Sequence, residues 1–103
     1  RKEYAIAECP SDIESPTVLA AQTANELLDI SGIKASFVLT VYEGRIYLSA
    51  RSIDEVNVQI IAEKLGGGGH INSAGAQFDH TNIQEVITIL KQTIDEMIEE
   101  GDI

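Results

Sequence analysis

The glycine run Gly66–Gly69 and the adjacent His70 are the residues of this sequence whose types and spacing could bind an anion. Successive glycine amides can form a concave nest around a phosphate, and glycine lets the phosphate approach the main chain closely. A histidine directly after the run can add a hydrogen bond or a charge. The alternative is a glycine helix cap followed by a flexible loop, which explains one glycine well and four poorly. We favour a phosphate site, although not a Walker loop, because no lysine follows the glycines.

Arg51 is the side chain best suited to complete such a site. Its fork-shaped guanidinium can bind a phosphate through two hydrogen bonds or stack on a base. The alternative is a solvated arginine at the end of a strand. The chain has 17 acidic residues against 7 lysines and arginines, a formal net charge of −10. A phosphate therefore needs a local cation such as Arg51.

The sequence shows no nucleophile, metal cage or general base beside this predicted phosphate site. Two histidines, one cysteine and scattered carboxylates match no H-E-x-x-H motif, cysteine pair or calcium loop. His80 is expected in a surface loop. The lone Cys9 cannot form an intrachain disulfide, which favours a reducing compartment and a buried or idle thiol. The residues therefore predict half of an active site.

Length and charge restrict the class of protein. A chain of 103 residues that is 44% apolar can close one modest core, so one domain is expected. The acidic balance repels long nucleic acid. No apolar run approaches the ~18 residues of a membrane span, and we expect a soluble domain without direct membrane contact. The absence of an initial methionine suggests a fragment of a longer protein.

Strand and helix signals interleave in the order β-α-β-β-α-β-α, which predicts a mixed α/β fold with about three helices packed on one small sheet. The expected strands cover residues 4–7, 35–42, 45–52 and 74–78, and the expected helices cover 16–29, 58–65 and 83–98. The continuous apolar run at 35–42 suggests a strand covered on both faces. The pair Glu43-Gly44 predicts a hairpin between the two central strands.

Polar residues and glycine predict where the helices begin and end. Ser15 can cap the first helix. Asp54 or Asn57 can cap the second, which ends at the glycine run. Thr81 and Gln84 form a T-x-x-Q capping box before the last helix.

Three segments together resemble the DHH-associated domain that closes DHH-family phosphoesterases. They are Ser49-Ala50-Arg51-Ser52, Asn57-Val58-x-x-Ile61-Ala62 and Gly67-Gly68-Gly69-His70-x-x-Ser73-Ala74-Gly75. Their order and spacing match the family, with Ser73 in place of an alanine. The resemblance covers about residues 4–98 and suggests that 1–103 is a single substrate-binding domain, a C-terminal fragment of a longer protein.

The resemblance implies roles for five residues. Gly67, Gly68, Gly69 and His70 would contact the substrate phosphate across an interdomain cleft, and Arg51 would bind a phosphate or the base. It also implies that the manganese ligands belong to a preceding DHH domain of the same chain. This fragment would then hold no cofactor and be inactive alone.

Within the family, the lengthened glycine run and the acidic balance most resemble membrane-anchored cyclic-di-AMP phosphodiesterases. In that interpretation a metal-activated hydroxide on the absent domain opens the cyclic dinucleotide, while this cytoplasmic domain clamps the substrate and neutralises transition-state charge. The parent protein would then be membrane-anchored.

Other functions stay open. The same loop resembles nano-RNA hydrolases, phosphoadenosine phosphatases and RecJ-type single-strand exonucleases, although acidity disfavours a track for a long strand. A non-catalytic nucleic-acid-binding module, as in the C-terminal domain of alanyl-tRNA synthetases, or a purely structural interaction domain would need no active site.

Overall fold

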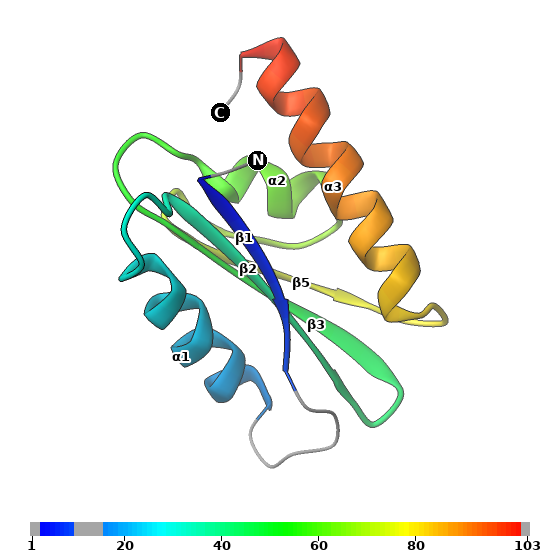
Figure 1. Cartoon of the computed structure of the whole chain (residues 1–103). Coiled ribbons are helices and arrows are strands. Elements are labelled where there is room, and N and C mark those ends of the chain that lie inside the picture. The colour runs from blue at the N-terminus through cyan, green and yellow to red at the C-terminus, as the bar shows by residue number, and fades with distance from the viewer. Residues whose placement is uncertain (1–2, 10–15, 102–103) are drawn as a thin grey trace.

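A five-stranded sheet separates one helix from two others in the computed structural model, which describes residues 3–9 and 16–101 (Figure 1). The elements are β1 (Tyr4–Glu8), α1 (Pro16–Leu28), β2 (Ala35–Tyr42), β3 (Arg45–Ser52), α2 (Val58–Lys64), β4 (Gly68–His70), β5 (Ser73–Phe78) and α3 (Ile83–Glu100). Among these described elements, no helix combines the length and apolarity required to cross a bilayer. The predicted cap Ser15 lies outside the described residues.

The predicted mixed α/β class is confirmed, and the structure contains one strand more than the sequence suggested. The extra strand is β4, in the segment expected to be a glycine loop. The sheet order is β1-β2-β3-β5-β4, so β4 is an edge strand held by β5 alone. Glycine has a low intrinsic preference for strands, and β4 therefore depends on tertiary pairing that local sequence does not reveal.

The sheet is mixed because its connections differ in length. β1 and β2 are parallel, and α1 makes the crossover that parallel strands require. β2 and β3 form the predicted antiparallel hairpin. Its turn residues Glu43 and Gly44 have φ values of 51° and 79°, as in the primed two-residue turns that suit the twist of a hairpin.

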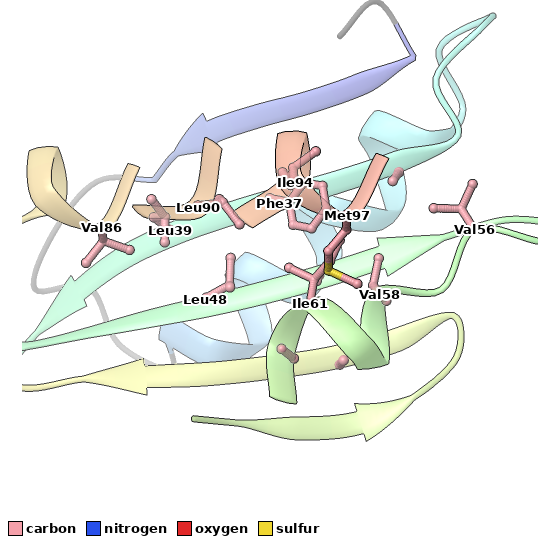
Figure 2. Packing of buried hydrophobic residues seen from close by; sticks show 14 of the residues in the cluster. Phe37, Leu39, Leu48, Val56, Val58, Ile61, Val86, Leu90, Ile94 and Met97 are labelled. Carbon is pink, nitrogen blue, oxygen red and sulfur yellow. The ribbon is translucent and has the colours of Figure 1, made fainter. Parts of the chain in front are cut away.

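The main core lies between the sheet and the pair α2 and α3 (Figure 2). Phe37 and Leu39 of β2 pack there with Leu90 and Met97 of α3. A smaller cluster on the opposite face joins Val38 to Ala20, Ala24 and Cys9. The prediction that residues 35–42 are covered on both faces is therefore confirmed for the first six of them. Cys9 is a free, buried thiol, as expected.

Asparagines cap α2 and α3. The Asn57 side chain accepts a hydrogen bond from the Ile60 amide, so of the two predicted caps Asn57 is used, and Asp54 lies in a turn with φ of 55°.

For α3 the predicted Thr81–Gln84 box is wrong by one residue. The cap is Asn82, which accepts a 2.9 Å hydrogen bond from the Glu85 amide. Asparagine is the stronger N-cap residue. In addition, the Glu85 carboxylate lies in the first turn, where the helix dipole favours a negative charge.

Candidate functional site

The face of the sheet that carries α1 is only partly covered, and its uncovered part forms an open cleft of about 590 Å³. α1 packs against β2 and β3, and the cleft extends over β3, β5 and the glycine run. Ala20 and Ala21 of α1 form one wall of the cleft. The cleft therefore exists because α1 is too narrow to cover all five strands of the sheet.

Strand register arranges the floor of the cleft in three cross-strand rows. The rows are Arg51–Ser73–His70, Ser49–Gly75–Gly68 and Tyr47–Gln77. Residues directly opposite each other in antiparallel strands project from the same face of the sheet. This is the α1 face, because Arg51 is opposite Ser36, whose hydroxyl donates to the Ala24 carbonyl of α1. The middle row carries almost no side chain and forms a trough between two rows of larger ones.

Arg51 is half-buried and lines the cleft. Its Nη1 donates to the Ala50 carbonyl at 2.8 Å and, more weakly, to the Ala74 carbonyl at 3.5 Å. Within residues 3–9 and 16–101, Arg51 forms no ion pair, whereas Arg45 on the same face of the same strand pairs with Asp79 at 3.3 Å. The guanidinium is thus held in place by neutral carbonyls, and its charge remains available to an anion.

The cleft differs in charge from the rest of the chain. Among the described residues that line the cleft, Arg51 alone is charged, and none is an aspartate or a glutamate. The whole chain has a formal net charge of −10. A carboxylate-free cavity around one cation is a local environment in which an anion is favoured.

The glycine run consists of a helix end followed by a strand, which differs from the predicted nest. The Gly66 and Gly67 amides donate to the Glu63 and Ala62 carbonyls and close α2. These two amides are therefore used by the fold. The predicted phosphate-binding residues Gly67, Gly68 and Gly69 nevertheless all line the cleft.

Close packing explains two of these three glycines. A Cβ added to Gly67 would lie 2.0 Å from the Gly75 carbonyl oxygen, and one added to Gly69, whose φ is +145°, would lie 2.5 Å from Ala74 Cα. A Cβ on Gly68 would meet nothing within 4 Å. The fold therefore requires the first two glycines, whereas Gly68 leaves open space in the trough.

His70 is the predicted site residue that the structure places apart from the others. It is exposed at the end of the edge strand β4 and does not line the cleft. It shares a cross-strand row with Arg51 through Ser73. His70 therefore lies beside the cleft, on the same face of the sheet. His80 is an exposed residue with φ of 58°, as expected for a surface turn.

Sequence reasoning missed Tyr47, Gln77 and Asn72. Tyr47 and Gln77 line the cleft, and the two-residue alternation along β3 could have identified Tyr47 as lying on the face of Arg51. The Asn72 side chain donates to Ser52 Oγ at 2.8 Å and to the Val56 carbonyl at 3.3 Å. It thereby joins the β4–β5 turn to the end of β3, a contact between distant segments that no local pattern predicts.

The described residues do not fit a manganese site. Among them, no three histidine, cysteine, aspartate or glutamate side chains gather closely enough to hold a metal ion. The cleft can bind and orient an anion, and its described lining offers no nucleophile paired with a base.

The fold and the cleft together define a mixed α/β domain with an open cleft whose described lining carries one arginine and no carboxylate. The chain belongs to the DHHA1 domain family, whose model matches residues 2–96. The resemblance noted in the sequence is therefore confirmed.

Curated relatives share much of this sequence. The chain is 45% identical over 92 residues to the cyclic-di-AMP phosphodiesterase PdeA of Listeria monocytogenes, a match that covers 88% of the chain and 14% of that protein. It is 44% identical over 104 residues to the cyclic-di-AMP phosphodiesterase GdpP of Bacillus subtilis, covering 98% and 16% respectively. A membrane protein–large ribosomal subunit bL9 fusion protein of Aster yellows witches'-broom phytoplasma is 38% identical, covering 96% and 12%. The chain thus spans less than a fifth of each relative.

Two solved structures share the fold. The C-Ala domain of Aquifex aeolicus alanyl-tRNA synthetase matches with a TM-score of 0.66 and 16% identity, covering 85% of this chain and 88% of that domain. An exopolyphosphatase-related protein of Bacteroides fragilis matches with a TM-score of 0.63 and 24% identity, covering 72% and 22%. At these identities the similarity concerns the fold alone.

Proposed function

We propose that this chain is the substrate-binding domain of a manganese-dependent phosphodiesterase that hydrolyses cyclic di-AMP. The observation that carries the proposal is Arg51, a cation without an ion-pair partner among the described residues, in a cleft whose described lining contains no carboxylate. The names of the Listeria and Bacillus relatives support the choice of substrate. The metal and its ligands would belong to a DHH domain of the same chain.

Arg51 and the glycine run would together bind one phosphate. Nη1 is directed to main-chain carbonyls, which leaves the other guanidinium N–H groups to donate to phosphate oxygens. Partial burial strengthens that contact, because a lower local dielectric weakens screening. Gly68 would let the phosphate approach the strand closely. His70, exposed beside the cleft, would contact the phosphate from the side of the edge strand.

The cellular setting follows from the same proposal. The domain would be cytoplasmic, in a parent protein anchored to the membrane. The word "membrane" in the name of the phytoplasma relative supports this arrangement.

The test is hydrolysis of cyclic di-AMP by the full-length protein with manganese, comparing Arg51→Ala and His70→Ala with the unmodified form. Arg45→Ala is the matched control, because Arg45 lies on the same face of the same strand but is paired with Asp79. Loss of a charged hydrogen bond of about 1.5–3 kcal/mol predicts a fall in kcat/KM of roughly tenfold or more for Arg51→Ala. A smaller loss is expected for the exposed His70.

The outcome that would overturn the proposal is equal kcat/KM for the Arg51 and Arg45 variants, with folding intact by circular dichroism. The cleft would then be a structural feature. Faster cleavage of short linear RNA than of cyclic di-AMP would instead support the nano-RNA hydrolase alternative.

A further inference from the structure

Tyr47 and Gln77 form an aromatic and amide pair in the same cleft, in the row farthest from Arg51. They are directly opposite each other on β3 and β5, and both line the cleft. Tyr47 is half-buried and Gln77 is exposed. Neither side chain has a hydrogen-bond partner within residues 3–9 and 16–101, so both keep their polar groups available to a ligand.

The position of this pair relative to Arg51 suits a ligand that is anionic at one end and aromatic at the other. Arg51 is the fourth residue after Tyr47 along β3, a spacing of roughly 13 Å. Between them lies the Ser49–Gly75–Gly68 row, which no large side chain obstructs. Ala20 and Ala21 add an apolar wall. A nucleotide could therefore lie along the trough with its phosphate at Arg51 and its base at Tyr47.

The chemistry of the pair distinguishes between purine bases. A tyrosine ring provides a stacking surface for any base. A glutamine amide presents one donor and one acceptor, which match the N7 acceptor and N6 donor of adenine. The corresponding edge of guanine presents two acceptors, which require two donors, as an arginine would supply. No arginine or lysine lines this end of the described cleft, and Arg45, the next residue on this face of β3, is paired with Asp79.

We propose that Tyr47 and Gln77 form a nucleobase subsite that stacks on one base and selects adenine over guanine. This inference rests on the proposed function, since it assumes that a phosphate is held at Arg51. It adds a specificity-determining pair to the phosphate contacts.

The experiment measures kcat/KM of the full-length protein for cyclic di-AMP. Cyclic di-GMP is tested in parallel, either as a substrate or as a competitive inhibitor. Gln77→Met keeps the length of the side chain and removes both hydrogen bonds. We expect a roughly tenfold fall for cyclic di-AMP and no fall for cyclic di-GMP, because a bidentate contact discriminates at about that level. Gln92→Met, an exposed change on α3, is the control and should alter neither value.

Tyr47 is tested by its ring and not by its hydroxyl. Tyr47→Leu should lower kcat/KM for both dinucleotides about tenfold because stacking is lost. Tyr47→Phe keeps the ring and should keep the value of the unmodified protein. If Arg51→Ala impairs hydrolysis while Gln77→Met leaves the adenine preference unchanged, the base subsite is wrong and the proposed function stands. If neither Arg51→Ala nor Gln77→Met changes hydrolysis, both proposals are overturned.

Discussion

Gly67, Gly68 and Gly69 are adjacent in sequence but differ in the space that surrounds them. Main-chain atoms of β5 exclude a side chain at Gly67 and at Gly69, whereas the space above Gly68 is open. Packing against β5 therefore accounts for the outer two glycines without any ligand. Only at Gly68 does the missing side chain lack a reason within the described fold, which favours a reason in the ligand.

This difference can be measured by comparing Gly67→Ala with Gly68→Ala. The Gly67 variant must displace main chain and should lose roughly 1–3 kcal/mol of unfolding free energy or more. The Gly68 variant should keep the melting temperature of the unmodified protein, yet hydrolyse cyclic di-AMP more slowly because its methyl group fills the trough. Full activity in Gly68→Ala would mean that the phosphate does not approach this strand.

At the scale of elements, the short turn between β4 and β5 is tied to distant residues by the side chain of Asn72, which lies within the turn. Asn72 Nδ2 donates to Ser52 Oγ, and the Ser52 hydroxyl donates to the Val56 carbonyl at 2.6 Å. Ser52 is buried. These bonds connect the end of β3, which carries Arg51, to the edge strand, which carries His70.

Asn72→Ala should destabilise the domain by about 1–3 kcal/mol, because it removes hydrogen bonds around the buried hydroxyl of Ser52. Urea denaturation gives the free energy of unfolding. Asn25→Ala, at an exposed position of α1, is the matched control and should show no loss. Equal stabilities of the two variants would show that the strand pairing and the main-chain hydrogen bonds of the turn hold it without the Asn72 side chain.

The start of α3 offers a second test at the same scale. Removing the cap with Asn82→Ala should cost about 1 kcal/mol of unfolding free energy, whereas Gln84→Ala should cost almost nothing. If Gln84→Ala instead loses more unfolding free energy than Asn82→Ala in a urea titration, the capping box of Thr81 and Gln84 suggested by the sequence would be supported.

The sequence predicts the elements of this domain whose signal lies in neighbouring residues, and misses those that depend on contacts between distant segments. The stripe that includes Val86, Leu90 and Ile94 predicted α3, because helical spacing is local and these residues are buried as expected. The β4 strand was missed because its pairing with β5 exists only in the folded chain. Arg51 and the glycines were found by residue type, while Gln77 was missed because a single glutamine carries no motif.

At the scale of the whole molecule, charge and shape separate the classes of ligand. The chain is strongly acidic, so a long polyanion meets repulsion outside the cleft. The cleft itself is open along one face of the sheet, and its described lining provides one cation. A small dinucleotide needs only the cleft, whereas a long strand would also lie against the rest of a chain whose formal net charge is −10.

Salt dependence measures this difference directly. With one or two phosphates neutralised, the affinity for cyclic di-AMP should fall only about three- to sevenfold between 50 and 200 mM salt, as estimated from the slope per phosphate contact for single strands. A protein that tracks a long strand through many contacts loses roughly a thousandfold or more over the same range. The measurement is the KM of the full-length protein for cyclic di-AMP across a series of KCl concentrations, and Arg51→Ala should flatten even the shallow slope. A steep slope in the unmodified protein would indicate many phosphate contacts and favour the nucleic-acid-binding alternative, because a single guanidinium in a carboxylate-free cleft cannot produce it.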